Sequence, residues 1–273
     1  MEHGFVNVNS GRIYYESSGT GLPVVFIHAG FLDSRMWDMQ FASFSGKYKV
    51  IRYDVRGFGK SSVPNSPYSD ASDLKMLLDA LGIPNAVLVG VSNGGRIAFD
   101  FSVEYPEMVA GLIPFDFVIK GYESSGPEED ELVSQFDSLE ENYKNLVENG
   151  KLRDAAAIDV DMWASRIPKD KREWLLDIAQ ENVLREQEDW QKFQNSPEPL
   201  AFKRLNVLTM PVIMILGDRD LPGIIMQVKR VHETLKGSKL MILEGADHIP
   251  SLSKTEEFNS ILESILHDIL ISH

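Results

Sequence analysis

Cysteine is absent from this chain of 273 residues. Without a thiol there can be no disulfide, no cysteine-ligated metal site and no thiolate nucleophile. Basic residues are also scarce, since 27 lysines and arginines stand against 41 aspartates and glutamates, for a formal net charge of −14. Nucleic acids and anionic membranes bind to basic surfaces, so we expect neither kind of partner.

Long apolar runs are missing as well. The longest mostly apolar stretch, Leu205–Leu216, is broken by polar residues and a proline, and it is too short to span a bilayer. The first residues, Met1–Glu16, combine an early acid with alternating polar residues and lack the basic and apolar regions of a secretory signal. We therefore expect a cytoplasmic protein, and the apolar content of 43% is enough for a sizeable core.

Short apolar runs alternate with segments of helical periodicity along most of the chain. Phe5–Val8 and Arg12–Glu16 predict an antiparallel hairpin. The expected buried strands are Val24–His28, Lys49–Asp54, Ala86–Val91, Val109–Phe115, Val212–Gly217 and Lys239–Glu244, and the expected helices are Ser34–Phe44, Asp70–Leu81, Asn93–Tyr105, Ile224–Leu235 and Thr255–Leu270. This alternation predicts an α/β fold, a parallel sheet with helices on both faces.

Residues 116–203 interrupt the alternation. They contain no convincing strand, and they carry 21 acidic and 11 basic side chains. Three charged stretches favour helices: Glu128–Asn149, Lys151–Ala164 and Lys169–Phe193. We interpret residues 116–203 as a helical cap (lid) inserted after the sixth core strand, with residues 1–115 and 204–273 forming the core. The alternative is a plain surface excursion.

A candidate nucleophile lies in the segment Gly90-Val91-Ser92-Asn93-Gly94, between an expected strand and an expected helix. A strand that turns sharply into a helix forces the serine into a strained backbone, and glycines let the two elements pack closely. The start of the helix also favours developing negative charge. The alternative is a glycine-rich turn that simply needs small residues.

A serine hydroxyl needs a base and an acid to become a good nucleophile. His248 is the candidate base because it follows the last expected strand, where reactive groups collect in a parallel sheet. Asp220 is the preferred acid, and it would fix the histidine tautomer. Asp218 in the same loop, whose alternative role is that of a turn residue, and Asp116 after the sixth strand are its rivals.

The negative charge that develops on the carbonyl oxygen requires two N–H donors. The backbone of Asn93 is one candidate, and Gly30 in the loop after Val24–His28 is the other, with Phe31 as its neighbouring alternative. His28 is expected to brace that loop by hydrogen bonds rather than to act as a second base.

These landmarks together resemble the α/β-hydrolase fold family, over essentially the whole chain. The resemblance implies an eight-stranded, mostly parallel sheet with an antiparallel second strand, a helical lid after the sixth strand, and hydrolysis through an acyl-enzyme without a metal or a cofactor. Two residues depart from the family pattern: Ala29 replaces a usual glycine, and Asn93 replaces a usual Met or Leu. The segments that carry the resemblance are Phe26–Gly30, Arg52–Ser61, Gly90–Gly95 and Gly245–His248.

Two further stretches, Ser34–Asp38 and Leu77–Ile83, are similar to the branch of small carboxylesterases and 3-oxoadipate enol-lactonases. We therefore predict a serine hydrolase, monomeric or homodimeric, that acts on a small ester or lactone. Its substrate pocket would include Phe31, Trp163 and Asn93. For Asn93, the alternative is a side chain that only caps the start of the helix.

Two other functions remain open on the same residues. One is the hydrolysis of a carbon–carbon bond in β-diketone-like ring-cleavage products, and the other is a ligand sensor with slow turnover. Haloalkane dehalogenase and epoxide hydrolase chemistry is disfavoured, because position 92 is Ser rather than a carboxylate that could form an alkyl ester.

Overall fold

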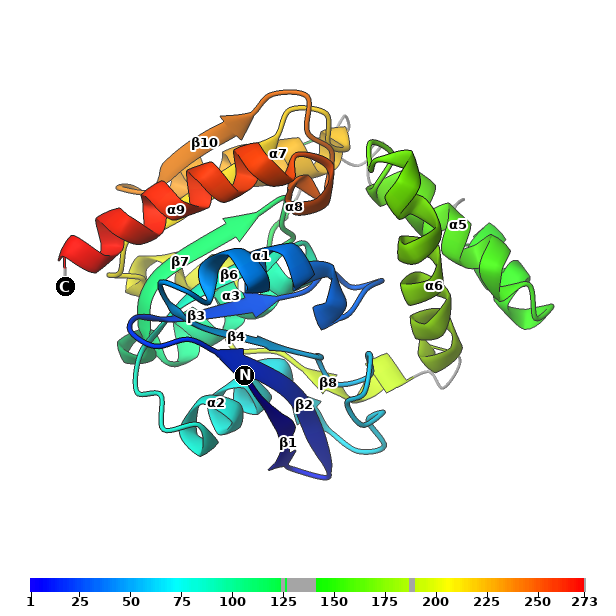
Figure 1. The fold of residues 1–273 in the computed structure, drawn as a ribbon, viewed down its shortest axis with the longest axis horizontal. Helices are drawn as coiled ribbons and strands as arrows, with labels where there is room; N and C mark the ends of the chain where they lie inside the picture. Colours follow the sequence, from blue (N-terminus) through cyan, green and yellow to red (C-terminus); the bar gives the residue numbers. More distant parts are fainter. Residues whose placement is uncertain (124–125, 127–140, 187–189, 273) are drawn as a thin grey trace.

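One eight-stranded sheet forms the centre of the molecule (Figure 1). The structure, a computed structural model, describes residues 1–123, 126, 141–186 and 190–272. The strands lie in the order β1-β2-β4-β3-β6-β7-β9-β10, and only the pairs β1/β2 and β2/β4 are antiparallel. Their bounds are Glu2–Val8 (β1), Gly11–Ser18 (β2), Pro23–Ile27 (β3), Lys49–Tyr53 (β4), Ala86–Val91 (β6), Val109–Phe115 (β7), Ile213–Gly217 (β9) and Lys239–Leu243 (β10). The predicted mostly parallel sheet with an antiparallel second strand is confirmed.

Helices cover both faces of this sheet. Successive residues of a strand point to opposite faces, and along β3 Val24 and Phe26 join the apolar cluster of α1 and α9, while Val25 and Ile27 join that of α2, α3 and α7. The helices of the two layers are Asp38–Phe44 (α1) and Thr255–Ser272 (α9) on one face, and Asp70–Ala80 (α2), Asn93–Glu104 (α3) and Pro222–Thr234 (α7) on the other. The predicted α/β architecture is therefore correct, with element ends shifted by at most three residues, the largest shift being the start of β1 at Glu2 instead of Phe5.

Several short elements escaped prediction. The expected helix Ser34–Phe44 begins as a 3-10 turn, because the Asp33 side chain accepts a hydrogen bond from Arg35 N–H and caps it. The short elements of the core are Ser34–Trp37 (η1), Pro106–Met108 (η2), Ala201–Val207 (η4) and Pro250–Ser253 (α8).

The expectation of no strand in residues 116–203 is wrong. Gln194–Asn195 (β8) pairs in parallel with Tyr68–Ser69 (β5), two residues on each side. A two-residue polar strand has no apolar alternation, so the pattern could not reveal it.

The predicted helices of this inserted segment are confirmed in part. Lys151–Ala164 corresponds to α5 (Leu152–Trp163). Lys169–Phe193 contains α6 (Lys169–Glu186) and the 3-10 turn η3 (Trp190–Phe193), and its residues 187–189 lie outside the described residues. Of Glu128–Asn149, residues 128–140 lie outside the described residues, and residues 141–148 are helical.

Helices α5 and α6 stand at the end of the sheet to which the parallel strands point (Figure 1). Asn182 of α6 is buried, donates to the carboxylate of Asp33 (Nδ2–Oδ2 3.3 Å) and accepts from the N–H of Gly59 (2.9 Å). The inserted helices thus contact loops at the carboxyl ends of β3 and β4, and the division into core and cap stays a prediction. No described helix is both long enough and apolar enough to cross a membrane.

The tight turn from β6 into α3 generates a stability prediction. A Cβ added to Gly90 would overlap the carbonyl oxygen of Gly94, which is backbone and cannot rotate away. Gly90→Ala should therefore lower the free energy of unfolding by about 3 kcal/mol, measured by urea denaturation. Gly46→Ala is the matched control, because no atom lies within 4 Å of its added Cβ. Equal stability of the two variants would contradict the close packing described for this turn.

Candidate active site

The predicted site residues follow the carboxyl ends of neighbouring strands. β3 and β6 pair in the middle of the sheet, with Ile27 opposite Gly90. In the sheet, β4 lies on one side of β3 and β6 on the other. Ligands of parallel sheets commonly bind at the carboxyl ends of the strands where the strand order reverses in this way. Gly30 and Ser92 belong to the loops after β3 and β6.

Ser92 lies in the sharp turn between β6 and α3. Its backbone is in a left-handed region, with φ 54° and ψ −119°, a conformation that is rare for a residue with a side chain. The turn is held because Ser92 N–H donates to the carbonyl oxygens of Phe115 (3.2 Å) and Asp116 (3.1 Å). A Cβ on Gly94 would overlap the carbonyl of Ile27. The two glycines around Ser92 are therefore required by contact between backbones.

His248 and Asp220 form a buried pair. The imidazole Nδ1 lies 2.8 Å from Asp220 Oδ2, and the two side chains are at most 1% exposed. A carboxylate accepts, so Nδ1 carries the proton and Nε2 has the free lone pair. Nε2 is buried and finds no hydrogen-bond partner among the described residues. This histidine can therefore accept a proton at Nε2.

The rival acids occupy other positions. Asp218 Oδ1 accepts from the N–H of Gly245 (2.6 Å), which makes Asp218 a residue that holds two loops together. Asp116 Oδ1 accepts from the N–H of Gly217 (2.9 Å). Of the three candidates, Asp220 is the one that pairs with His248.

Gly30 and Asn93 lie next to each other, one in the loop after β3 and the other at the start of α3. A Cβ on Gly30 would lie 3.4 Å from Cβ of Asn93, so the two backbones predicted to supply N–H donors are neighbours. The alternative hypothesis, in which the Asn93 side chain caps the start of α3, is wrong. Its Oδ1 accepts from Arg96 Nε at 2.8 Å.

Arg96 is a residue of this region that the sequence reasoning missed. It is buried in α3 and forms ion pairs with Asp70 (2.5 Å) and Asp100 (2.9 Å). Its place three residues after Asn93, on the same helix face, was the available signal. Because arginine only donates, it fixes which end of the Asn93 amide faces it, so the Asn93 Nδ2 group is directed elsewhere.

His28 braces the loop that contains Gly30. Nε2 accepts from the N–H of Val55 (2.9 Å), so the proton is on Nδ1, which donates to the Ala29 carbonyl (2.8 Å). Burial lowers the pKa of His28 below its ordinary value, which keeps the ring neutral. Both nitrogens are occupied, as expected of a structural histidine.

The two predicted aromatic pocket residues differ in their surroundings. The Trp163 ring, at the end of α5, lies against the His248 ring with centroids 4.5 Å apart. Phe31 is 9% exposed and belongs to the apolar cluster of α1 and α9. Trp163 therefore contacts the histidine directly, whereas Phe31 is mainly a core side chain; their part in binding a substrate stays a prediction.

Asp247, next to His248 in sequence, connects this loop to the inserted segment. Its Oδ2 accepts from the backbone N–H of Arg166 (2.8 Å), and its Oδ1 accepts from Ser253 Oγ (2.7 Å) and from the N–H of Ile249 (3.3 Å). The sequence reasoning did not single out Asp247. The turn between α5 and α6 is thus attached to the loop that carries the histidine.

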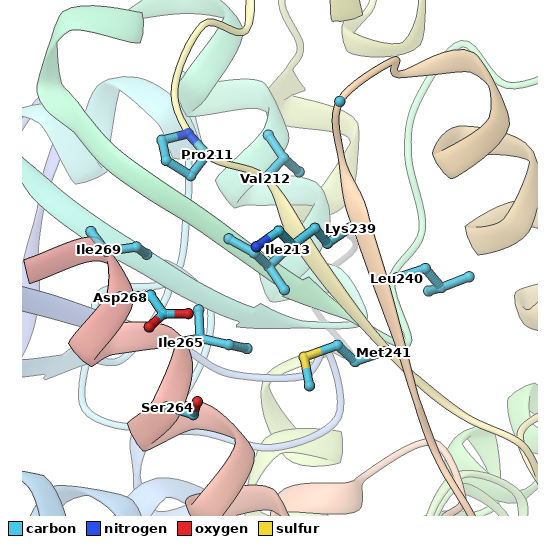
Figure 2. Close-up of a pocket in the computed structure, with 11 residues that line it drawn as sticks. Pro211, Val212, Ile213, Lys239, Leu240, Met241, Ser264, Ile265, Asp268 and Ile269 are labelled. Atoms are coloured by element: carbon cyan, nitrogen blue, oxygen red, sulfur yellow. The ribbon is translucent and has the colours of Figure 1, made fainter. Parts of the chain in front are cut away.

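A cavity of about 630 Å³ lies elsewhere, between α9 and the beginnings of β9 and β10 (Figure 2). Ile213, Lys239 and Ile269 line it, at the end of the sheet opposite to Ser92 and His248. In the part of the chain that the structure describes, no three His, Asp or Glu side chains are arranged to hold a metal ion.

Known proteins resemble this chain over most of its length. The family model for the alpha/beta hydrolase fold matches residues 23–255. The chain is 26% identical to 3-oxoadipate enol-lactonase 2 of Acinetobacter baylyi, over 85% of this chain and 83% of that protein. The crystal structure of a bromoperoxidase from Bacillus anthracis superposes with a TM-score of 0.79 at 27% identity, covering 97% of this chain and 100% of that one.

A third relative matches over a shorter region. Epoxide hydrolase 4 of Mus musculus is 36% identical over 124 residues, which are 42% of this chain and 34% of that protein. The chain therefore aligns with only about a third of the length of this relative.

The contact between Asp247 and Arg166 generates a prediction about the α5–α6 turn. Asp247→Asn would bring an amide N–H toward the Arg166 N–H, and a lost hydrogen bond to a charged acceptor is worth about 1.5–3 kcal/mol. Tryptic cleavage after the exposed Arg166 should then accelerate on the order of tenfold, measured by mass spectrometry. Ser253→Ala is the control, since it removes a partner of the other carboxylate oxygen. Identical cleavage rates in both variants would exclude the proposed attachment.

Proposed function

Because this chain belongs to the α/β-hydrolase fold family, we propose that it is a serine hydrolase that cleaves small carboxylic esters or lactones through an acyl-enzyme. The observation that carries the proposal is the buried His248–Asp220 pair, whose Nε2 keeps a free lone pair. Asp220 and His248 lie in loops after the carboxyl ends of parallel strands, as Ser92 does. Members of the family have their nucleophile at this end of the sheet.

In the proposed mechanism Ser92 Oγ attacks the carbonyl carbon while His248 Nε2 takes its proton. Asp220 holds the ring in the required tautomer and stabilises the imidazolium that forms. The backbone N–H groups of Gly30 and Asn93 donate to the oxyanion of the tetrahedral intermediate. His248 then returns the proton to the leaving alcohol, and the acyl group remains on Ser92.

Water completes the cycle in a second, symmetrical step. His248 removes a proton from water as the water attacks the acyl carbon, and the proton returns to Ser92 Oγ as the acid leaves. In a lactone the leaving alcohol belongs to the same molecule, so a single hydroxy acid is the product. Every proton is carried by these side chains, and the proposed reaction requires neither a metal nor a cofactor.

The substrate class is inferred from the surroundings and from the relatives. Trp163 contributes an apolar surface next to His248, which suits a small acyl or alkyl group. The enol-lactonase that shares 26% of its aligned residues with this chain acts, by its name, on an enol-lactone. An ester or lactone is therefore proposed ahead of a carbon–carbon bond.

Two experiments separate the alternative functions. Comparison of kcat/KM on p-nitrophenyl esters, lactones and β-diketones distinguishes hydrolysis of an ester from cleavage of a carbon–carbon bond. Many turnovers per chain on p-nitrophenyl acetate and butyrate would exclude a ligand sensor with slow turnover.

The role of Ser92 is tested by Ser92→Ala. Loss of the nucleophile should lower kcat on p-nitrophenyl butyrate by about 10⁴ or more, and a fluorophosphonate should label the parent at Ser92 but not the variant. Ser45→Ala, at the end of α1, should leave both readouts unchanged. Near-parental turnover by Ser92→Ala would refute the assignment.

The role of Asp220 is tested against its neighbour in the same loop. Asp220→Asn would favour the wrong histidine tautomer, so kcat should fall by about 10⁴. Asp218→Asn keeps an oxygen that can accept from Gly245 N–H, and we expect activity within a few-fold of the parent. A larger loss in Asp218→Asn than in Asp220→Asn would reverse the assignment of the acid.

A further inference from the structure

A second carboxyl lies behind the Asp220–His248 pair. Asp116 follows β7, is fully buried and has φ 42°, a left-handed backbone that glycine, asparagine and aspartate adopt more readily than other residues. Its Oδ1 accepts from the N–H of Gly217, three residues before Asp220, so Asp116 lies against the loop that carries Asp220, and the two carboxyl groups interact. Two carboxylates in contact repel each other, whereas a carboxyl and a carboxylate share a proton.

The hydrogen bonds around the two groups determine which of them holds the proton. Asp220 accepts from His248 Nδ1 (2.8 Å) and from the N–H of Leu221 (2.6 Å), so its two oxygens each have a donor. Asp116 accepts only from the N–H of Gly217, at Oδ1 (2.9 Å), and its Oδ2 has no donor among the described residues. Hydrogen bonds from N–H groups favour the ionised form, so the proton belongs on Asp116 Oδ2.

The burial of Asp116 and the charges around it also favour its protonated form. Burial raises the pKa of the Asp116 carboxyl well above its usual range, and the negative charge of Asp220, in the loop after β9, raises it further. Asp247, in the loop after β10, adds a smaller effect of the same sign, and the N–H of Gly217 opposes both. His248 pairs with Asp220.

We propose that Asp116 carries a proton at neutral pH and donates it in a hydrogen bond to Asp220, so that it is a positioning residue for the carboxylate that orients His248. The catalytic part of this role rests on the proposed function. Asp220 would then be held by three donors, from Asp116, Leu221 and His248, and could not rotate away from the imidazole.

The test compares Asp116→Asn with Asp116→Ala. Asparagine accepts a left-handed backbone, keeps an oxygen for Gly217 N–H and presents an N–H to Asp220, so it reproduces a protonated aspartate. We expect kcat/KM on p-nitrophenyl butyrate within about threefold of the parent for Asn, and a loss of about 10- to 100-fold for Ala, since Asp220 loses a support. A loss of tenfold or more in Asp116→Asn would overturn the proposal.

A second readout does not depend on catalysis. The unfolded chain releases the Asp116 proton near pH 3.9, while the folded protein keeps it to higher pH. The folded parent therefore binds more protons than the unfolded chain in this window, and its stability falls as the pH rises. The asparagine side chain of the variant cannot titrate, so the Tm of Asp116→Asn minus that of the parent should increase by about 2–4 °C or more from pH 4 to pH 8.

Other buried acids do not disturb this comparison. The pKa of Asp73 and that of Asp100 are each raised to about 6, chiefly by burial, and both residues are common to the variant and the parent. A Tm difference that is constant or decreases with pH would show that Asp116 is ionised in the fold and would overturn the proposal. If the parent lacked esterase activity, the proposed function would fail, and the Tm difference would still decide the protonation of Asp116.

Discussion

At the centre of the sheet, backbone packs directly against backbone where β3, β6 and the start of α3 meet. Gly94 lies on the carbonyl groups of Ile27 and His28, and Gly90 lies on the carbonyl of Gly94. A side chain at either glycine would separate helix from strand, because a carbonyl oxygen of the backbone cannot move aside as a flexible side chain does. This contact forces Ser92 into its left-handed conformation and sets Asn93 beside Gly30. The positions of the proposed nucleophile and of both proposed N–H donors therefore depend on it.

The same end of the sheet concentrates three buried carboxyl groups, in the loops after β7, β9 and β10. Asp247 accepts three hydrogen bonds, Asp220 accepts two, and Asp116 accepts one from the described residues. Burial of an ionised carboxylate is costly unless donors replace water. The group with the fewest donors is therefore the one that can best keep its proton. The protonation proposed for Asp116 thus follows from the number of donors around each carboxyl group rather than from the count of acidic residues.

Sequence patterns predicted the features that are encoded locally. Strand and helix positions follow from periodicity, and Ser92 follows from glycine spacing between a strand and a helix. Contacts between distant loops left no such pattern: Asp247 meets Arg166 81 residues away, and Asn182 meets Asp33 149 residues away. The sequence favoured Asp220 over Asp116 and Asp218, although all three follow strand ends, and the contact between Asp220 and His248 comes from packing. The pairing of β5 with β8 was not predicted, because a strand of two residues is too short to show a periodicity.

The inserted helices make direct hydrogen bonds to the loops that carry the proposed site. Asn182 of α6 connects the loops after β3 and β4, and the turn after α5 is attached through Asp247 to the histidine loop. Their ion pairs, Arg153 with Glu173 and Asp177, and Arg172 with Asp161, involve carboxylates that are at least 65% exposed. Apart from Asn182, the buried residues described in these helices are apolar, and they include Ala155, Ala156, Val160, Leu175, Ile178 and Ala179. These acidic side chains therefore face solvent, where water and salt screen them, and the surface that Trp163 presents to His248 is a better guide to the substrate than the negative charge of the segment.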